Sequence, residues 1–218
     1  SSFLVTAKLA GIAYILAVVL GIVVGVVAAV NHGKWVDSAL MTISVFGISA
    51  PAFWIAIILQ IVICLKFNLL PLSGIDSFKS FILPGIALGT RYAASIARIT
   101  RTSMLDVLSQ DYIRTAEAKG LKGWVVTIKH ALRNALIPII TIAGSDLGNI
   151  LTGSVLVESV FSIPGIGKML VDSINTRDLP IVQGGVMYIA VICVIMYLVV
   201  DLLYTVVDPR IRLGKESS

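Results

Sequence analysis

The chain has 218 residues, of which 57% are hydrophobic and only 13% are charged, and its net charge is +5. A soluble domain of this size could not hide so much apolar surface from water, so the composition predicts an all-α polytopic membrane protein. The positive charge does not indicate a nucleic-acid partner, because no basic stripe alternates with stacking aromatic residues. Cys64 and Cys193 fall in apolar runs and are expected to be packing residues rather than a disulfide or metal site.

Five apolar segments are long enough to cross a bilayer as helices. In chain order they cover residues 9–30, 40–65, 81–98, 136–157 and 181–207. Gly21 and Gly25, four residues apart in the first segment, predict close contact with another helix. Pro51 should kink the second segment. The third segment has Pro84 in its first turn, and its helix is expected to continue to Leu108. We therefore treat residues 1–218 as a single transmembrane domain.

Arg91 lies inside the third segment and Asp146 inside the fourth. A lone charge in the bilayer is costly, so each side chain must find water or a partner. Three arrangements are open: a direct pair, separate exposure to a wet pathway, or burial against other polar groups. We assign both residues to the translocation pathway.

The basic residues are distributed unequally between the two sides of this arrangement. The turn at Lys34, the interval 98–133 and the tail after 207 together carry eleven Lys and Arg residues, whereas the opposite side carries five. Arg91 is the remaining one of the 17. Since basic residues concentrate in cytoplasmic loops, the large interval and the C-terminus are predicted to be cytoplasmic and the N-terminus external.

The longest polar interval, residues 111–138, is predicted to fold into two short helices. Asp111 should cap a helix that begins at Tyr112. Ala116 and Gly120 are four apart and share a face, which would let a partner approach closely. Gly120 should then end the helix in a left-handed conformation.

The second piece of the interval has apolar residues at helical spacing. Trp124, Ile128 and Leu132 should form one face of an amphipathic helix. From the pattern alone, the whole interval could equally be a solvated basic loop that only sets the membrane topology.

The wording of this interval, DYIRTAEAKGL followed by HALRNALIP, resembles the cytoplasmic loop of ABC-importer permeases of the dipeptide/oligopeptide/nickel family. The general ABC-importer motif has Glu, Ile and Pro where this chain has Arg114, His130 and Arg133, and these departures are typical of the peptide/nickel branch. The stretches at 158–167, 177–184, 201–204 and 208–212 also resemble that family, in the same order.

The resemblance implies a transmembrane subunit of an ATP-driven importer that forms the pathway for a solute, expected to be a di- or oligopeptide. Implied partners are a second, related permease chain in a heterodimer, two ATPase subunits and an extracytoplasmic solute-binding protein. The chain itself would be no enzyme and hold no cofactor, because ATP and Mg²⁺ would be bound by the ATPase subunits. It would be a multi-pass protein of a bacterial or archaeal cytoplasmic (inner) membrane. The family usually has one more helix before the point that matches Ser1.

The resemblance also assigns two functional segments. The coupling loop, 99–135, would act on the ATPase through residues 114–121, with Ala116 and Gly120 at the closest contact. Its site residues are Arg114, Thr115, Ala116, Glu117, Ala118, Gly120 and Leu121. The outer segment, 158–180, would shape an outer gate. Its site residues are Glu158, Phe161, Pro164, Gly165 and Gly167. Pro164 and Gly165 suit a type II turn, and Gly167 suits a helix start or a close approach.

The alternative function is a secondary transporter or channel without an ATPase, and a weaker one is a membrane scaffold that transports nothing. The chain has no GxxxxGK[ST] nucleotide-binding motif, no nucleophile elbow and no HExxH motif. His32 and His130 are expected to be solvated or interface residues rather than a metal pair. The solute could be a dipeptide, an oligopeptide, a nickel chelate, glutathione or a sugar, since selectivity is expected to lie mainly in the binding protein.

Overall fold

The computed structural model describes residues 2–75 and 77–207, and every regular element in these ranges is a helix. The α-helices are α1 (Ser2–Val30), α2 (Trp35–Ser49), α3 (Ala52–Leu59), α4 (Ile82–Leu108), α5 (Asp111–Ala118), α6 (Gly123–Val125), α7 (Arg133–Val160), α8 (Ile166–Asn175) and α9 (Leu179–Val207). Two π-helical segments, Gln60–Lys66 and Val126–Leu132, follow α3 and α6, and a 3₁₀ turn, Phe78–Phe81, leads into α4. The predicted all-α class is confirmed. The predicted closing motif at 208–212 lies outside the described residues.

Helices occupy all five of the predicted membrane segments. Three stretches are long and apolar enough to cross a membrane by themselves, namely Ser2–Val30, Gly123–Ile150 and Leu179–Val200. The helix α4 has 27 residues, or about 40 Å at 1.5 Å per residue, but it is more polar than these three. It ends at Leu108, as predicted.

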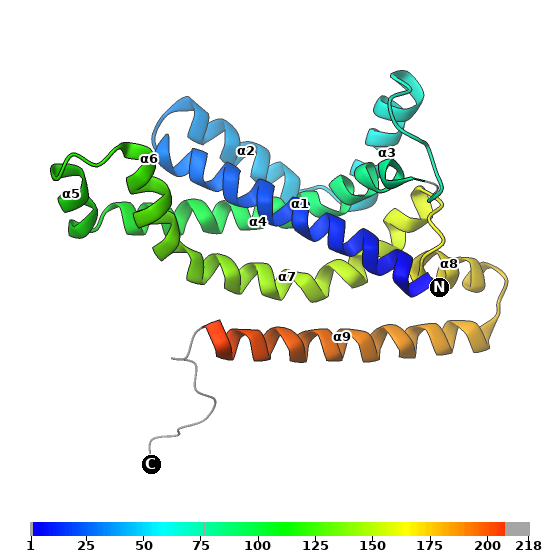
Figure 1. Ribbon diagram of the computed structural model, residues 1–218. Helices are drawn as coiled ribbons and strands as arrows, with labels where there is room; N and C mark the ends of the chain where they lie inside the picture. Colours follow the sequence, from blue (N-terminus) through cyan, green and yellow to red (C-terminus); the bar gives the residue numbers. More distant parts are fainter. Residues whose placement is uncertain (1, 76, 208–218) are drawn as a thin grey trace, which may run out of the picture.

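The second predicted segment is broken rather than kinked at Pro51. The helix α2 ends at Ser49, Ala50 is extended, and α3 begins after Pro51 with its axis turned by 107°. Pro51 has no N–H to continue the α2 ladder, and its carbonyl instead accepts the Trp54 N–H at 3.0 Å. The expectation of one continuous kinked helix was therefore wrong, and α3 turns away from the direction of α2 and packs against α4 and α7 (Figure 1).

The helices α1 and α4 lie side by side at the centre of the bundle (Figure 1). Their close approach depends on Gly21 and Gly25, as the sequence predicted. A Cβ atom on Gly21 would lie 2.8 Å from the Ala93 carbonyl oxygen, and one on Gly25 would lie 2.6 Å from the Ala97 carbonyl oxygen. Any larger side chain at either glycine would force the two helices apart.

The two ends of the bundle carry different segments (Figure 1). The helices α5 and α6 and the turn between α1 and α2 lie at one end. The helix α8, the helix α3 and the start of α1 lie at the other. The helix α9 runs along one side, against α7 and α8. The basic interval and the predicted outer segment therefore lie at opposite ends of the molecule.

Candidate functional site

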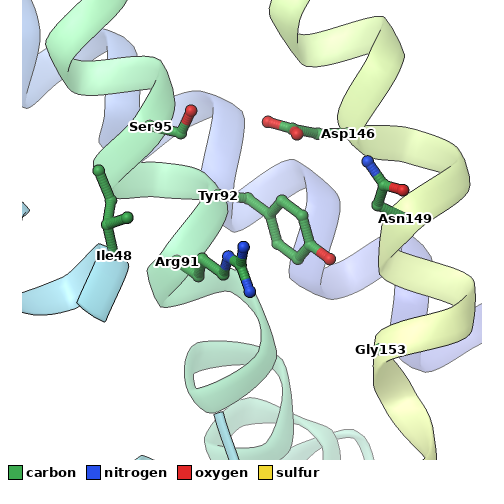
Figure 2. Close-up of a pocket in the computed structure, with 7 residues that line it drawn as sticks. All are labelled: Ile48, Arg91, Tyr92, Ser95, Asp146, Asn149 and Gly153. Carbon is green, nitrogen blue, oxygen red and sulfur yellow. The ribbon is translucent and has the colours of Figure 1, made fainter. Parts of the chain in front are cut away.

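A polar cavity of about 500 Å³ lies between α2, α4 and α7, in the middle of the bundle (Figure 2). Its walls come from one face of each of the three helices. It is lined by Ile48, Arg91, Tyr92, Ser95, Asp146, Asn149 and Gly153. The α7 residues are spaced at i, i+3 and i+7, so helical periodicity turns them to the same side. The cavity unites the two intramembrane charges that the sequence assigned to the translocation pathway.

Arg91 and Asp146 do not form the direct pair that was one of the three predicted arrangements, since no nitrogen of Arg91 lies within 4.0 Å of an oxygen of Asp146. The Arg91 side chain is exposed, whereas Asp146 is 8% exposed and points toward the cavity. Its Oδ2 atom is buried and accepts no hydrogen bond from the part of the chain that the structure describes. The geometry matches the second arrangement, in which the two charges face one polar space separately.

Three further polar side chains of this cavity were not predicted, namely Tyr92, Ser95 and Asn149. The last of these is held in place from α9, because the Tyr197 hydroxyl donates to Asn149 Oδ1 at 3.0 Å. The signal in the sequence was helical spacing from the two charges, since each missed residue lies one, three or four positions from Arg91 or Asp146. Which of these faces the cavity depends on how the helices pack, and the sequence alone does not give that.

At the end of the bundle that carries α5, the first short helix ends as predicted. Gly120 has a φ of +76° and terminates α5 in a left-handed conformation. Its N–H donates to the Glu117 carbonyl at 2.9 Å, and the Leu121 N–H donates to the Ala116 carbonyl at 3.4 Å, which together make a Schellman motif. The start differs from the prediction. Asp111 is the first helical residue and not the cap, a position that belongs to Gln110.

The close contact of Ala116 with a partner stays a prediction, and in this chain Ala116 lies on the inner face of α5. Ala116 is buried and packs with Ile113, Val126 and Ala131 in the chain's own core. Its small side chain brings α5 close to the following π-helical segment. The other predicted coupling residues are exposed: Arg114, Thr115, Glu117, Ala118, Gly120 and Leu121.

The second piece of the interval is helical, but its apolar residues do not all face inward. Trp124 is 68% exposed and Ile128 is half exposed, while Leu132 is partly buried. The segment Val126–Leu132 winds as a π-helix, which differs from the α-helix that the spacing predicted. Trp124 and Ile128 instead line a surface groove beside the end of α1.

Asp37, which the sequence analysis did not single out, anchors the turn between α1 and α2 to α4. Its carboxylate is buried and accepts from Arg101 Nε at 2.6 Å and Nη2 at 2.7 Å. His32 Nδ1 lies 3.2 Å from Asp37 Oδ2 and 3.0 Å from Arg101 Nη2. His32 is solvent-exposed and also belongs to this clamp. Arg101 therefore has a structural role in addition to its predicted contribution to membrane topology.

In the outer segment, Glu158 is fully buried and its carboxylate caps the start of α8. It accepts from the Gly167 N–H at 2.8 Å, the Lys168 N–H at 3.2 Å and the Ser154 hydroxyl at 3.1 Å. Negative charge at this position also compensates the positive end of the helix dipole. A Cβ atom on Gly167 would lie 2.8 Å from Glu158 Oε2, so the predicted helix start with close approach at Gly167 is confirmed.

The predicted type II turn at Pro164–Gly165 does not form. That turn needs a positive φ at its third residue, and Gly165 has a φ of −90°. The left-handed residue is Ser162, with a φ of +51°, which ends α7 in a Schellman motif through the Ile163 N–H and the Glu158 carbonyl, 2.9 Å apart. Phe161 is buried in the core and Pro164 is exposed.

Comparison with known proteins places the chain among membrane transport subunits. The family described as binding-protein-dependent transport system inner membrane component matches residues 21–213. The glutathione transport system permease protein GsiC of Escherichia coli K12 is 44% identical over 212 residues, which cover 97% of this chain and 69% of that protein. The dipeptide transport system permease protein DppB of Bacillus subtilis is 45% identical over 215 residues, 99% of this chain and 70% of that protein.

Two solved structures share the fold at 16% sequence identity. An amino acid ABC transporter crystallised with histidines has a TM-score of 0.70, with 94% of this chain and 91% of that chain covered. The MetNI methionine ABC transporter in an inward facing conformation has a TM-score of 0.75, with 95% and 94% covered. At this identity the likeness extends to the fold alone.

Proposed function

This chain belongs to the family of binding-protein-dependent transport system inner membrane components, and we propose that its cavity between α2, α4 and α7 is part of a pathway for short peptides. The chain is a transmembrane permease subunit of an ABC importer and is not itself an enzyme. An importer of this family also includes ATPase and solute-binding components.

One observation carries the proposed pathway. Arg91 and Asp146 lie on α4 and α7 within predicted membrane segments, and both line one polar cavity. Charged groups at membrane depth are costly unless they face water or a solute, so this cavity is the natural route for a polar molecule. Two relatives, a glutathione permease of Escherichia coli and a dipeptide permease of Bacillus subtilis, support a peptide as that molecule.

The geometry of α5 supports its role as the coupling element. Its inner face, through Ile113 and Ala116, is packed against the chain's own core, while its outer face is free to meet an ATPase subunit. Only Ser109 and Gln110 separate α5 from the end of α4. The helix α4 then runs unbroken back to the cavity, so a push on α5 would reach Arg91 along one rigid rod.

The remaining assignments follow the same scheme. The chain would pair with a second, related permease and with two ATPase subunits, which bind the ATP and Mg²⁺. The corner between α7 and α8 would face an extracytoplasmic solute-binding protein, with Glu158 and Phe161 acting as its buried anchors. The C-terminus would lie in the cytoplasm of a bacterium or archaeon, as the excess of Lys and Arg on that side supports.

The test is uptake by the complete transporter. The full chain, its companion permease, the ATPase subunits and the binding protein are reconstituted in liposomes that contain ATP, and entry of a radiolabelled dipeptide is measured. We expect uptake that requires both ATP hydrolysis and the binding protein. ATPase subunits unable to hydrolyse ATP are the control. Uptake driven by an ion gradient without ATPase subunits would favour the secondary-transporter alternative.

A further inference from the structure

We infer that the cavity is itself a binding site for the two charged ends of a short peptide, with the peptide's ammonium group at Asp146 and its terminal carboxylate at Arg91. This inference rests on the proposed function and adds a selectivity step inside the permease. The permease would then reject peptides whose amino or carboxyl terminus is blocked.

Asp146 supplies the first half of the site. Its side chain is more than nine-tenths buried and points toward the cavity, and its buried Oδ2 atom has no hydrogen-bond donor among the described residues. A buried carboxylate oxygen that no donor meets is expensive, so the protein keeps it only where donors arrive from the cavity. A peptide ammonium group carries a full positive charge and three N–H donors, which suit this position.

Arg91 supplies the second half. It lines the same cavity from α4, and no carboxylate of the described residues lies within 4.0 Å of it. A guanidinium group presents paired N–H donors that match the two oxygens of a carboxylate. A solute with only one charge would leave either Arg91 or Asp146 without a counter-charge, whereas a zwitterion satisfies both.

The dimensions fit a molecule of this size. The volume of about 500 Å³ is within the range of small-molecule sites. Two extended residues span roughly 7 Å, and Arg91 and Asp146 are more than 4.0 Å apart, so a dipeptide is longer than a direct ion pair between the two groups would be. The Tyr92 ring lies between Arg91 and Asn149 in Figure 2 and gives the cavity an aromatic wall. Asn149 is already engaged by Tyr197, which fixes this side of α7.

The test measures equilibrium binding to the assembled permease and ATPase complex without the binding protein, so that only the cavity selects. The probes are radiolabelled alanyl-alanine, its N-acetyl form and its C-terminal amide. In Asp146→Asn, affinity for alanyl-alanine should fall about ten- to a hundredfold, the range for loss of a hydrogen bond to a charged group, while affinity for the N-acetyl form stays unchanged. In Arg91→Gln, affinity for alanyl-alanine should likewise fall, while affinity for the C-terminal amide stays unchanged. Arg98→Gln, on the same helix but outside the cavity, is the control.

The crossed design separates a specific role from damage to the fold, because a misfolded complex would lose all three probes together. Equal weakening of free and blocked probes, or no binding of alanyl-alanine by the unchanged complex, would overturn the inference. Uptake by the full transporter is measured in parallel. If the unchanged transporter imports no peptide, the proposed function fails. If it imports normally and neither variant alters the rate, only this binding site fails.

Discussion

At the scale of single residues, Glu158 belongs to a predicted functional motif and has a structural role, which is to cap the start of α8. Its carboxylate has no contact with solvent and serves three donors at the corner between α7 and α8. The sequence reading recognised the motif but assigned the turn to Pro164 and Gly165. Proline at 164 disfavours a helical conformation at Ile163, so the helix has to end before it, and Ser162 takes the left-handed position.

Replacement of Glu158 by Ala should destabilise the protein by about 3 kcal/mol, because it leaves one buried and one partly buried N–H group at the start of α8 without an acceptor. The measurement is thermal unfolding of the purified permease in detergent. Glu117→Ala removes an exposed carboxylate on α5 and should change stability by less than about 0.5 kcal/mol. Equal melting temperatures for the two variants would contradict the capping role.

The separation of Arg91 and Asp146 also makes a prediction at this scale. Arg91→Leu and Asp146→Leu should have nearly additive effects on unfolding, with a coupling energy below about 1 kcal/mol, because the two groups face the cavity without touching. A direct buried pair would behave differently, since each single change would strand one charge and cost roughly 3–5 kcal/mol while the double change restored much of it. Rescue of stability in the double variant is the result that this geometry forbids.

At the scale of elements, α5 is fixed on one face and free on the other. Ile113 and Ala116 join it to the core, and Asp37 and Arg101 clamp the neighbouring turn to α4. The end of the bundle that carries α5 is therefore rigid enough to move as a unit. The sequence predicted the helix and its glycine stop from local rules, but not the packing of Ala116 on the inner face, because the face a helix buries is decided by its tertiary neighbours.

Gly120→Leu should uncouple ATP hydrolysis from peptide uptake while the permease still folds. A side chain at this position would project into open space just after the end of α5, where an ATPase subunit is proposed to dock. The change also costs about 1–2 kcal/mol of backbone strain, because φ is +76°. Gly33→Leu is a matched control, since Gly33 has a φ of +77° and no atom within 4 Å of an added Cβ, but lies in the turn after α1. Equal loss of coupled activity in both variants would mean that backbone strain alone is responsible.

At the scale of the whole molecule, the lengths of the apolar runs predicted five helical segments. Whether a run is long enough to cross a bilayer can be judged from that run alone. The 107° break at Pro51 and the residues that line the cavity beside Arg91 were not predictable in the same way. Proline marks a weak point in a helix but not the angle, which packing decides. The residues beside a lone charge come from other helices, and one sequence does not give their order in space.

The opposite ends of the bundle make a final prediction about topology. Lys122 follows α5 and Lys168 lies in α8, so the two side chains belong to opposite ends of the bundle and must face opposite sides of the membrane (Figure 1). The excess of basic residues puts Lys122 in the cytoplasm. In a background with Cys64 and Cys193 replaced by Ser, Lys168→Cys should react with a membrane-impermeant maleimide in intact spheroplasts. Lys122→Cys should react only after the membrane is opened.

Labelling of Lys122→Cys alone from outside would reverse the orientation, and labelling of both in intact cells would contradict the separation of the two ends. Agreement would leave α5 facing the compartment where ATP is available and α8 facing the side from which a binding protein delivers its solute.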